Sequence, residues 1–195
     1  MECLKRYDFL TQIECDTIVN EILSLEDAVK RLGPDIYGGT SEDSLTGRYK
    51  YFNFLNVHEI NTILEPKLKE IFGPCVVQCW ANIFRQGEGI EEHIHFDGED
   101  PTYIERHGVT GNIFLYGDPT TGTYYNFPEL GPFHVKYDNK VGELSLFTPT
   151  LFHGVPKNTT GDMRISMAID VHKDLTEDMV NYRMSEKDIP FFYIR

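Results

Sequence analysis

The sequence lacks positive charge. Its 18 Lys and Arg residues face 31 Asp and Glu residues, which gives a formal net charge of −13, and no stretch is rich in Lys or Arg. An electrostatic field of this sign repels a nucleic-acid duplex and an anionic membrane surface. We therefore expect neither nucleic acid nor a membrane as a general partner.

Long apolar runs and cysteine pairs are also missing. No apolar stretch approaches the length of a membrane span, and the N-terminal segment MECLKRYDFL has no apolar signal core. The four cysteines include no C-x-x-C pair, so they offer no zinc site. These absences predict a reduced, cytoplasmic protein.

A chain of 195 residues fits one domain with a genuine core. We expect helical support over residues 1–74, the main core over 75–172 and a C-terminal tail over 173–195. Apolar residues recur at helical spacing within 9–32, with Thr11 or Asp16 as the cap, and within 57–73, where Pro66 should kink or break the helix. The aromatic end IPFFYIR is expected to pack back onto the body.

From residue 75 the pattern changes to short segments rich in β-branched and aromatic residues, separated by Gly, Pro, Asp and Asn. Because no helical stretches lie between them, they indicate an antiparallel sandwich or barrel rather than a parallel sheet. The predicted fold class is α+β, mainly β. The expected strands lie within residues 76–85, 111–117, 122–127, 133–137, 142–148 and 163–172.

The stretch GEGIEEHIHFDGED, residues 87–100, places His95 and Asp97 two residues apart. In an extended strand such residues face the same side and can reach one point. An H-x-D triplet alone is a weak signal, because it often occurs by chance. Its value depends on what the rest of the chain supplies.

Two later segments supply the missing parts. His153 follows the strand-like GELSLFT, and Arg164 and Ser166 lie two apart in MRISMAIDV. Two neutral imidazoles and one carboxylate form the facial triad of non-heme Fe(II) oxygenases. Arg164 adds a permanent cation whose fork fits a carboxylate, and Ser166 adds a hydroxyl donor.

In these segments the sequence resembles the Fe(II)/2-oxoglutarate-dependent dioxygenases, specifically their prolyl-4-hydroxylase-like branch. GEGIEEHIHFD is similar to the strand leading into that family's H-x-D, and GELSLFTPTLFHGVPKNTTGDMRISMAIDV to its distal-histidine and cosubstrate-arginine segment. FLTQIECDTIVNEI is similar to the helix that opens many members. The resemblance spans nearly the whole chain and implies a double-stranded β-helix, or jelly roll, with supporting N-terminal helices.

The resemblance also implies roles. His95, Asp97 and His153 would bind Fe(II), while Arg164 with Ser166 would hold the distal carboxylate of 2-oxoglutarate. The reaction would consume O2 and 2-oxoglutarate, release succinate and CO2, and hydroxylate a substrate, with no catalytic residue beyond the metal ligands. A peptide, including a prolyl residue, a free amino acid or another small molecule would fit as substrate, and the oligomeric state stays open.

A second ligand register is available. His93 and His95 also lie two apart, and some related sequences carry H-x-H at this point, which would leave Asp97 outside the ligand set. We prefer His95 with Asp97, because a carboxylate compensates the charge of the metal. His93 would then lie behind the ligands or at the mouth of the site.

Several residues carry two interpretations. Asn82 lines the core and helps to hold 2-oxoglutarate, or its side chain is satisfied by backbone groups. Residues 98–110 form a lid over the site or a solvated loop. Structural roles are expected for Cys75 and Cys79, and core positions rather than cosubstrate contacts for Tyr116 and Tyr124. Surface or satisfied core positions are expected for His58, His107, His134 and His172.

Two other functions compete with an oxygenase. One is a cupin-type metal-binding jelly roll, acting as an isomerase, sensor or binding module without 2-oxoglutarate. The other is a catalytically inactive barrel used for interaction. Arg164 argues against the first, because a site that binds only a metal needs no buried cation, and the intact ligand set argues against the second.

Overall fold

The computed structural model describes residues 4–33, 44–95, 108–127, 134–173 and 190–195. In these ranges the helices are α1 (Gln12–Lys30) and α2 (His58–Phe72), and Phe54–Asn56 forms a 3-10 turn. The strands are β1 (Leu4–Asp8), β2 (Cys75–Phe84), β3 (Ile90–His93), β4 (Gly108–Tyr116), β5 (Tyr124–Asn126), β6 (His134–Lys136), β7 (Glu143–Phe147), β8 (Phe152–Val155), β9 (Arg164–His172) and β10 (Phe192–Ile194).

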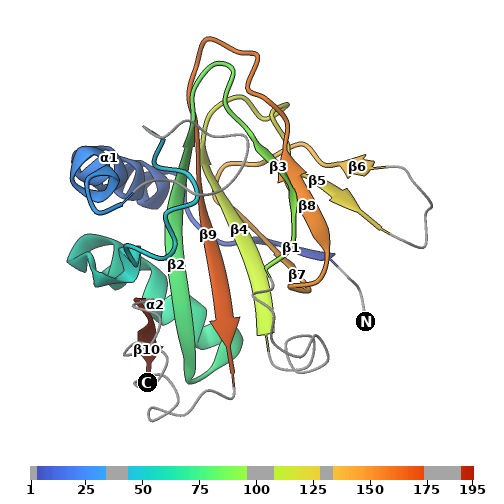
Figure 1. Ribbon diagram of the computed structural model, residues 1–195. Coiled ribbons are helices and arrows are strands. Elements are labelled where there is room, and N and C mark those ends of the chain that lie inside the picture. The colour runs from blue at the N-terminus through green and yellow to red at the C-terminus, as the bar shows by residue number, and fades with distance from the viewer. Residues whose placement is uncertain (1–3, 34–43, 96–107, 128–133, 174–189) are drawn as a thin grey trace.

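The strands form two antiparallel sheets that face each other (Figure 1). The larger sheet has the order β1-β7-β4-β9-β2-β10, and the smaller sheet has the order β3-β8-β5-β6. The predicted mainly β, α+β class is confirmed, and all six predicted strand segments are found. The two sheets do not close into a barrel.

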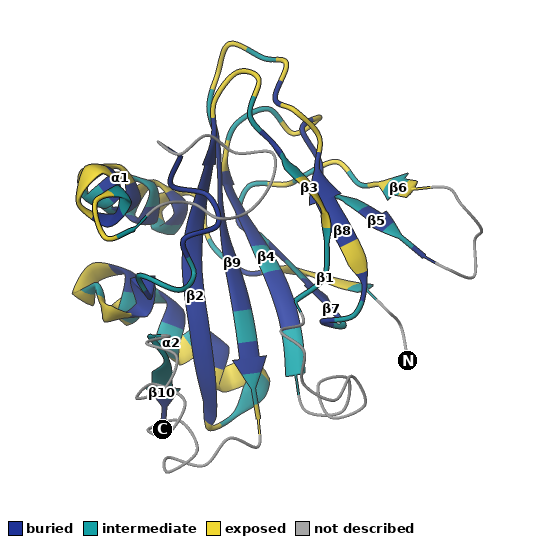
Figure 2. Cartoon of the chain, in the orientation of Figure 1, coloured by how far each residue is buried: buried dark blue, intermediate teal, exposed yellow. Residues whose placement is uncertain are grey.

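Both described helices cover the outer face of the larger sheet (Figures 1 and 2). Their buried residues recur every three or four positions, which places them on one stripe of each helix. These residues are Cys15, Ile18, Ile22, Glu26 and Val29 in α1 and Ile60, Leu64 and Leu68 in α2. Neither helix in the described part of the chain has the length and apolar content needed to cross a membrane.

The bounds of the two helices test two predictions, the N-terminal cap of α1 and the effect of Pro66 on α2. Thr11 caps α1 through a capping box with Glu14, while Asp16, the other candidate, lies inside the helix. α2 continues through Pro66 as one helix, so the expected break is wrong. Pro66 and Thr62 are exposed. The Thr62 carbonyl, which has no N–H partner at Pro66, can therefore bond to water.

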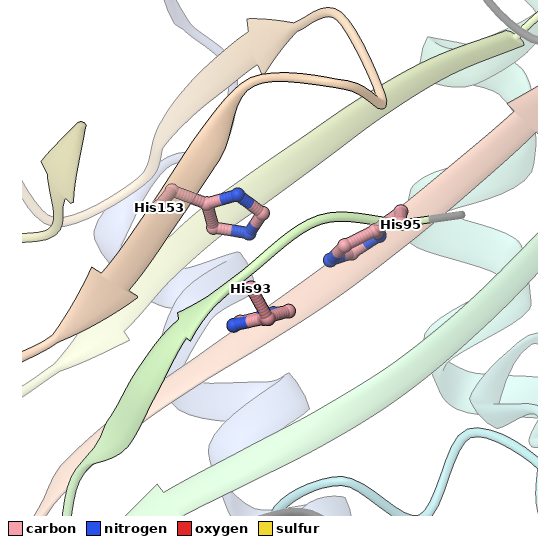
Figure 3. A group of neighbouring side chains, drawn as sticks. All are labelled: His93, His95 and His153. Carbon is pink, nitrogen blue, oxygen red and sulfur yellow. The ribbon is translucent and has the colours of Figure 1, made fainter. Parts of the chain in front are cut away.

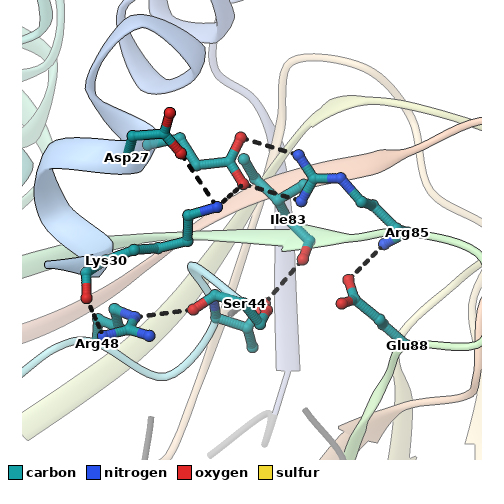
Figure 4. A network of polar contacts seen from close by, with 9 residues as sticks. Asp27, Lys30, Ser44, Arg48, Ile83, Arg85 and Glu88 are labelled. Atoms are coloured by element: carbon teal, nitrogen blue, oxygen red, sulfur yellow. Dashed lines mark hydrogen bonds and ion pairs between the residues drawn. The ribbon is translucent and has the colours of Figure 1, made fainter. Parts of the chain in front are cut away.

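An ion network ties the end of α1 to the end of β2 (Figure 4). Glu26 is buried, and its two carboxylate oxygens each pair with one terminal nitrogen of Arg85 at 2.9 Å. The Lys30 ammonium lies 3.4 Å from one of these oxygens. Buried Arg48 donates to the carbonyls of Lys30 and Ser44 at 2.8 Å each. The network holds the segment before α2 against the same end of the sheet.

The C-terminal strand returns to the body of the protein. β10 pairs antiparallel with β2, with Ile194 opposite Cys75, and Ile194 is fully buried. The expectation that the aromatic end packs back is confirmed for residues 190–195.

The pairing of β2 with β9 separates two kinds of side chain. The strands pair in register along nearly their whole length, and alternate side chains face opposite sides. One set, including Met167 and Ile169, packs with the helices in the main core. The other set faces the smaller sheet and is rich in polar groups, namely Gln78, Asn82, Arg164, Ser166 and Asp170. The candidate site lies on this polar face, between the sheets.

Candidate metal and anion site

Three histidines gather between the sheets (Figure 3). His93 ends β3 and lies directly opposite His153 of β8, with ring centroids 4.5 Å apart. The ring of His95 lies 5.3 Å from that of His93 and 5.0 Å from that of His153. One ring nitrogen from each residue lies within 4.8 Å of the other two. Neutral imidazoles at this spacing can converge on one divalent metal ion.

Backbone hydrogen bonds set the tautomer of two of these rings. His93 Nδ1 lies 2.8 Å from the Glu91 carbonyl, and His153 Nδ1 lies 2.9 Å from the Leu151 carbonyl. A carbonyl oxygen only accepts, so each Nδ1 carries the hydrogen and donates it. The lone pair is then on Nε2, which is free to bind a metal.

A carboxylate performs the same task for the third ring. His95 Nδ1 lies 2.7 Å from Asp170 Oδ1, and the Thr110 hydroxyl donates to the same oxygen at 2.8 Å. Burial raises the pKa of Asp170, but the imidazole of His95 and the Thr110 hydroxyl outweigh it and hold that pKa below its ordinary value. Asp170 is therefore an anion that accepts two hydrogen bonds.

Burial also sets the charge of the imidazoles. It lowers the pKa of His93 to about 4, with the charge of His95 as the next cause. It lowers the pKa of His153 well below the ordinary value, with the charges of His95 and His93 adding to the effect. Both rings are neutral at pH 7 and need not lose a proton to bind a metal.

Aromatic side chains line the histidine cluster. The Trp80 ring lies 5.4 Å from that of His95, and the Phe147 ring lies 4.6 Å from that of His153. Tyr125, 1% exposed, lies directly opposite His153 on the neighbouring strand β5. These rings exclude water from their side of the cluster and fix the planes of the imidazoles by contact.

Two of the predicted metal ligands, His95 and His153, thus meet in space, together with the alternative ligand His93. The preferred register placed His93 outside the ligand set, whereas the structure places it in the cluster. Asp97, the third predicted ligand, lies outside the described residues.

Arg164 is a buried cation with no anion beside it among the described residues. It is 1% exposed, and its two terminal nitrogens donate only to hydroxyl groups, those of Ser166 at 3.3 Å and Thr123 at 3.2 Å. Its Nε is buried with no hydrogen-bond partner. The guanidinium also lies over the rings of Phe84 and Phe114. Burial lowers the pKa of Arg164 to about 10, so it stays charged at neutral pH.

The other predicted cosubstrate residues lie beside Arg164. Ser166 follows it on the same face of β9 and is 1% exposed, and Asn82 lies directly opposite Ser166 on β2. The Asn82 carbonyl oxygen accepts from the backbone N–H of Gly47 at 3.3 Å. The backbone bond predicted by one interpretation of Asn82 is therefore present, and a role in holding 2-oxoglutarate stays a prediction.

The segment around β5 connects the two halves of the site. Thr123, which accepts from Arg164, lies two residues before Tyr125, which is opposite His153. The guanidinium is therefore linked, through the short segment Thr123–Tyr125, to the residue that lies opposite His153.

Two tyrosines differ from the expectation that they lie in the core. Tyr116 is 46% exposed, because a bulge after Phe114 shifts its register against β9. Tyr124 is partly buried, whereas its neighbour Tyr125 is the buried tyrosine. Burial raises the pKa of Tyr125 to about 12, and its hydroxyl bonds to Ser145.

The remaining predictions concern groups away from the cluster. Cys75 and Cys79 are buried free thiols whose pKa values burial raises, and their structural role stays a prediction. His58 and His134 are exposed, and His134 pairs with Glu92. His172 contacts the Phe191 ring, while His107 lies outside the described residues. The predicted lid or loop at 98–110 is outside them too, except for 108–110, which belong to β4.

Comparisons with known proteins identify the fold. No protein-family model matches the sequence, and no curated protein matches it significantly. Among solved structures, a Trichoplax adhaerens prolyl hydroxylase in complex with a peptide fragment of the hypoxia inducible factor oxygen degradation domain matches with a TM-score of 0.62 and 14% identity. The match covers 93% of this chain and 87% of that one.

Two further matches are similar in extent. SnoK, a non-heme alpha-ketoglutarate-dependent carbocyclase from nogalamycin biosynthesis, has a TM-score of 0.62 and 13% identity over 99% of this chain and 92% of that one. A Pseudomonas putida prolyl-4-hydroxylase has a TM-score of 0.55 and 16% identity over 89% and 94%. At these identities the likeness shows the fold, which is that of non-heme Fe/2-oxoglutarate oxygenases. The predicted jelly roll is confirmed.

Proposed function

We propose that the protein is an Fe(II)- and 2-oxoglutarate-dependent dioxygenase that hydroxylates a peptide, such as a prolyl segment, or a small molecule. The observation that carries this proposal is the pairing of two features between the same sheets. One is a cluster of three imidazoles, and the other is a buried guanidinium, Arg164, with no anion beside it in the described part of the chain. Together they provide for a metal ion and for a carboxylate that approaches it.

The side chains present fit Fe(II). His95 and His153 serve as ligands in either register, and the third ligand is His93 or Asp97. The contact of His93 with His153 favours His93. Bound iron, with O2 and 2-oxoglutarate, supplies the oxidising chemistry, and succinate and CO2 are the co-products.

Arg164 fits one carboxylate of 2-oxoglutarate. Its two bonded nitrogens contact neutral hydroxyls and its Nε has no partner, so its charge is not compensated by the described residues. A buried cation is costly without an anion, which a bound carboxylate supplies. Thr123 bonds to Arg164 and lies two residues before Tyr125, which is opposite His153, so a short dicarboxylate with one end at Arg164 could face the imidazoles with the other. Ser166 adds a second donor.

The substrate class follows from two matched structures. One holds a peptide fragment bound to a prolyl hydroxylase, and the other is a carbocyclase of a biosynthetic route. Both a peptide and a small molecule are therefore proposed as substrate classes. The free thiols of Cys15, Cys75 and Cys79 support a reducing, cytoplasmic compartment.

A cupin-type metal-binding protein without 2-oxoglutarate is the second candidate. The three-imidazole cluster favours it, because such a set contains no carboxylate ligand. Arg164 separates the two candidates, since only the oxygenase gives its buried charge an anion. Binding of 2-oxoglutarate to the metal-loaded protein is the measurement that decides between them.

The function is tested with purified protein, Fe(II), 2-oxoglutarate and O2. We expect slow formation of succinate without substrate, abolished in His95→Ala and His153→Ala, while His58→Ala, an exposed histidine on α2, behaves as wild type. Candidate peptides and small molecules are then screened for a mass gain of one oxygen. Absence of both 2-oxoglutarate binding and succinate would reject the oxygenase.

A further inference from the structure

The three imidazoles are oriented by two different kinds of acceptor. His93 and His153 each bond to a backbone carbonyl two residues earlier in the chain, so their partners come with the local fold. His95 bonds to Asp170, a side chain 75 residues away on β9 of the larger sheet. Of these three acceptors, only Asp170 can be changed by substitution.

His95 also depends most on such a partner. It lies beyond the last residue of β3, so no strand pairing fixes it, and its backbone N–H bonds to the Pro149 carbonyl at 2.9 Å. Its side chain is 9% exposed, and that of Asp170 is 19% exposed. The plane of the His95 ring is therefore set by the Asp170 bond and by contacts with neighbouring rings, such as Trp80.

Asp170 itself is firmly held. Thr110 lies directly opposite it on β4 and donates to the same carboxylate oxygen that faces His95. The three residues form a chain in which the Thr110 hydroxyl donates to the Asp170 carboxylate and the His95 Nδ1–H donates to it from the other side. Such a chain fixes the acceptor before any metal arrives.

We infer that Asp170 is a positioning residue that holds His95 with Nδ1 protonated and Nε2 directed to the metal. This inference rests on the metal site of the proposed function. The Asp170 carboxylate also places a negative charge next to His95. Imidazole ligands alone supply no negative charge to a metal ion. An anionic partner makes the imidazole a stronger ligand than a neutral carbonyl does.

The first test needs no metal. In a long-range ¹H–¹⁵N correlation spectrum of the metal-free protein at pH 8, we expect His95 to be protonated on Nδ1. We expect Asp170→Leu to lose this tautomer while the signals of His93 and His153 keep it. A His95 ring protonated on Nε2 in the wild type would overturn the inference, whatever the protein catalyses.

The second test measures affinity for Co(II) by titration, with the visible absorption of the bound ion as a spectroscopic signature. Loss of a partner behind a histidine ligand costs about 10- to 100-fold in metal affinity. We expect that loss in Asp170→Leu, a smaller loss in Asp170→Asn, whose amide oxygen still accepts, and the smallest in Thr110→Val. Asp162→Asn removes the same charge at an exposed position and serves as the control. Thermal unfolding of each metal-free variant separates loss of folding from loss of positioning.

The outcomes separate the two proposals. Variants of Asp170 that bind Co(II) as the wild type does, with an unchanged spectrum, overturn the positioning role and leave the oxygenase intact. Graded weakening in a protein that fails to bind 2-oxoglutarate supports the positioning role and rejects the oxygenase. A wild-type protein that binds no Co(II) rejects both.

Discussion

His93 and His153 lie opposite each other across the β3–β8 pair, with ring centroids 4.5 Å apart. The pairing joins segments 60 residues apart in sequence and holds two imidazoles on neighbouring strands. A metal bound by His153 therefore lies next to His93.

This geometry predicts the third ligand. We expect His93→Ala to lower Co(II) affinity by at least about 100-fold, beyond the cost of losing an outer partner. We expect Asp97→Ala to change it by less than about threefold. Both are measured by titration, with His58→Ala, an exposed histidine on α2, as the control. The reverse pattern would restore the triad of His95, Asp97 and His153.

The buried charge of Arg164 should lower the stability of the protein without 2-oxoglutarate and strengthen its binding of 2-oxoglutarate. Replacing a buried charge with an apolar side chain of similar volume is often neutral or stabilising by about 1–4 kcal/mol. We expect Arg164→Met to unfold at a higher temperature than the wild type without 2-oxoglutarate. The same variant should require about 10- to 100-fold more 2-oxoglutarate, because a charge-assisted bond contributes about 1.5–3 kcal/mol.

The measurements are thermal unfolding and 2-oxoglutarate titration of the metal-loaded protein. Added 2-oxoglutarate should raise the unfolding temperature of the wild type and hardly that of Arg164→Met, because only the wild type binds it well. Lys5→Ala, which removes an exposed cation on β1, controls for net charge. If Arg164→Met is less stable and binds 2-oxoglutarate normally, Arg164 is a structural residue.

The sequence was sufficient for the strands that carry Asn82, Arg164 and Ser166, because their patterns are local. β8, which carries His153, was not among the expected strand segments. Turn residues separate the segments that become β2, β4 and β9, and the two-residue spacing of Arg164 and Ser166 places both on one face. Asp170 continues the same alternation on β9, so its position facing inward could also have been predicted. Its bond to His95 could not, since that contact depends on how the two sheets face each other.

Other features of the structure were not predicted from the sequence, for different physical reasons. β1 and β10 lie in the segments that the sequence assigned to helical support and to the C-terminal tail, so no strand was expected there. Thr123 and Tyr125 gain their roles from contacts with Arg164 and His153 on other strands. A proline within a helical pattern indicates that the helix ends or kinks there. Pro66 is exposed, and α2 continues through it.

The ion pairs of Glu26 should make the stability of the protein depend on pH. Burial raises its pKa, but Arg85 and Lys30 outweigh this and lower it. A carboxyl whose pKa is lowered by folding stabilises the protein above its unfolded pKa, about 4.3, and this contribution is lost as the pH falls through the folded pKa. We expect Glu26→Gln to lower the free energy of unfolding by about 1–3 kcal/mol at pH 7.

Urea unfolding at several pH values measures this effect. The difference between wild type and Glu26→Gln should shrink below about pH 4, where the wild-type carboxyl takes up a proton. Glu70→Gln, on the exposed face of α2, should show no such difference at any pH. A difference that persists unchanged at pH 3 would assign the stability to packing rather than to charge.

The absence of a side chain at Gly154 lets β3 and β8 lie close together. A Cβ atom at this position would lie 2.4 Å from the Tyr124 hydroxyl and 2.9 Å from the Ile90 carbonyl of β3. The tyrosine can rotate away, but the carbonyl belongs to the strand, so Gly154→Ala should push β3 from β8 and separate His93 from His153. We expect about 1–3 kcal/mol of destabilisation, typical of overpacking, and weaker Co(II) binding. Gly161→Ala, with no atom within 4 Å of the added carbon, is the matched control.

A second substitution identifies the clash that matters. Tyr124→Ala removes both the hydroxyl and the ring carbon that crowd the added Cβ and leaves the Ile90 carbonyl in place. If the strand contact sets the metal site, Gly154→Ala with Tyr124→Ala should regain part of the stability but not the Co(II) affinity, because β3 stays displaced. Recovery of both would show that the tyrosine alone is crowded. Wild-type Co(II) binding by Gly154→Ala itself would show that the histidine cluster does not depend on the close pairing of β3 with β8.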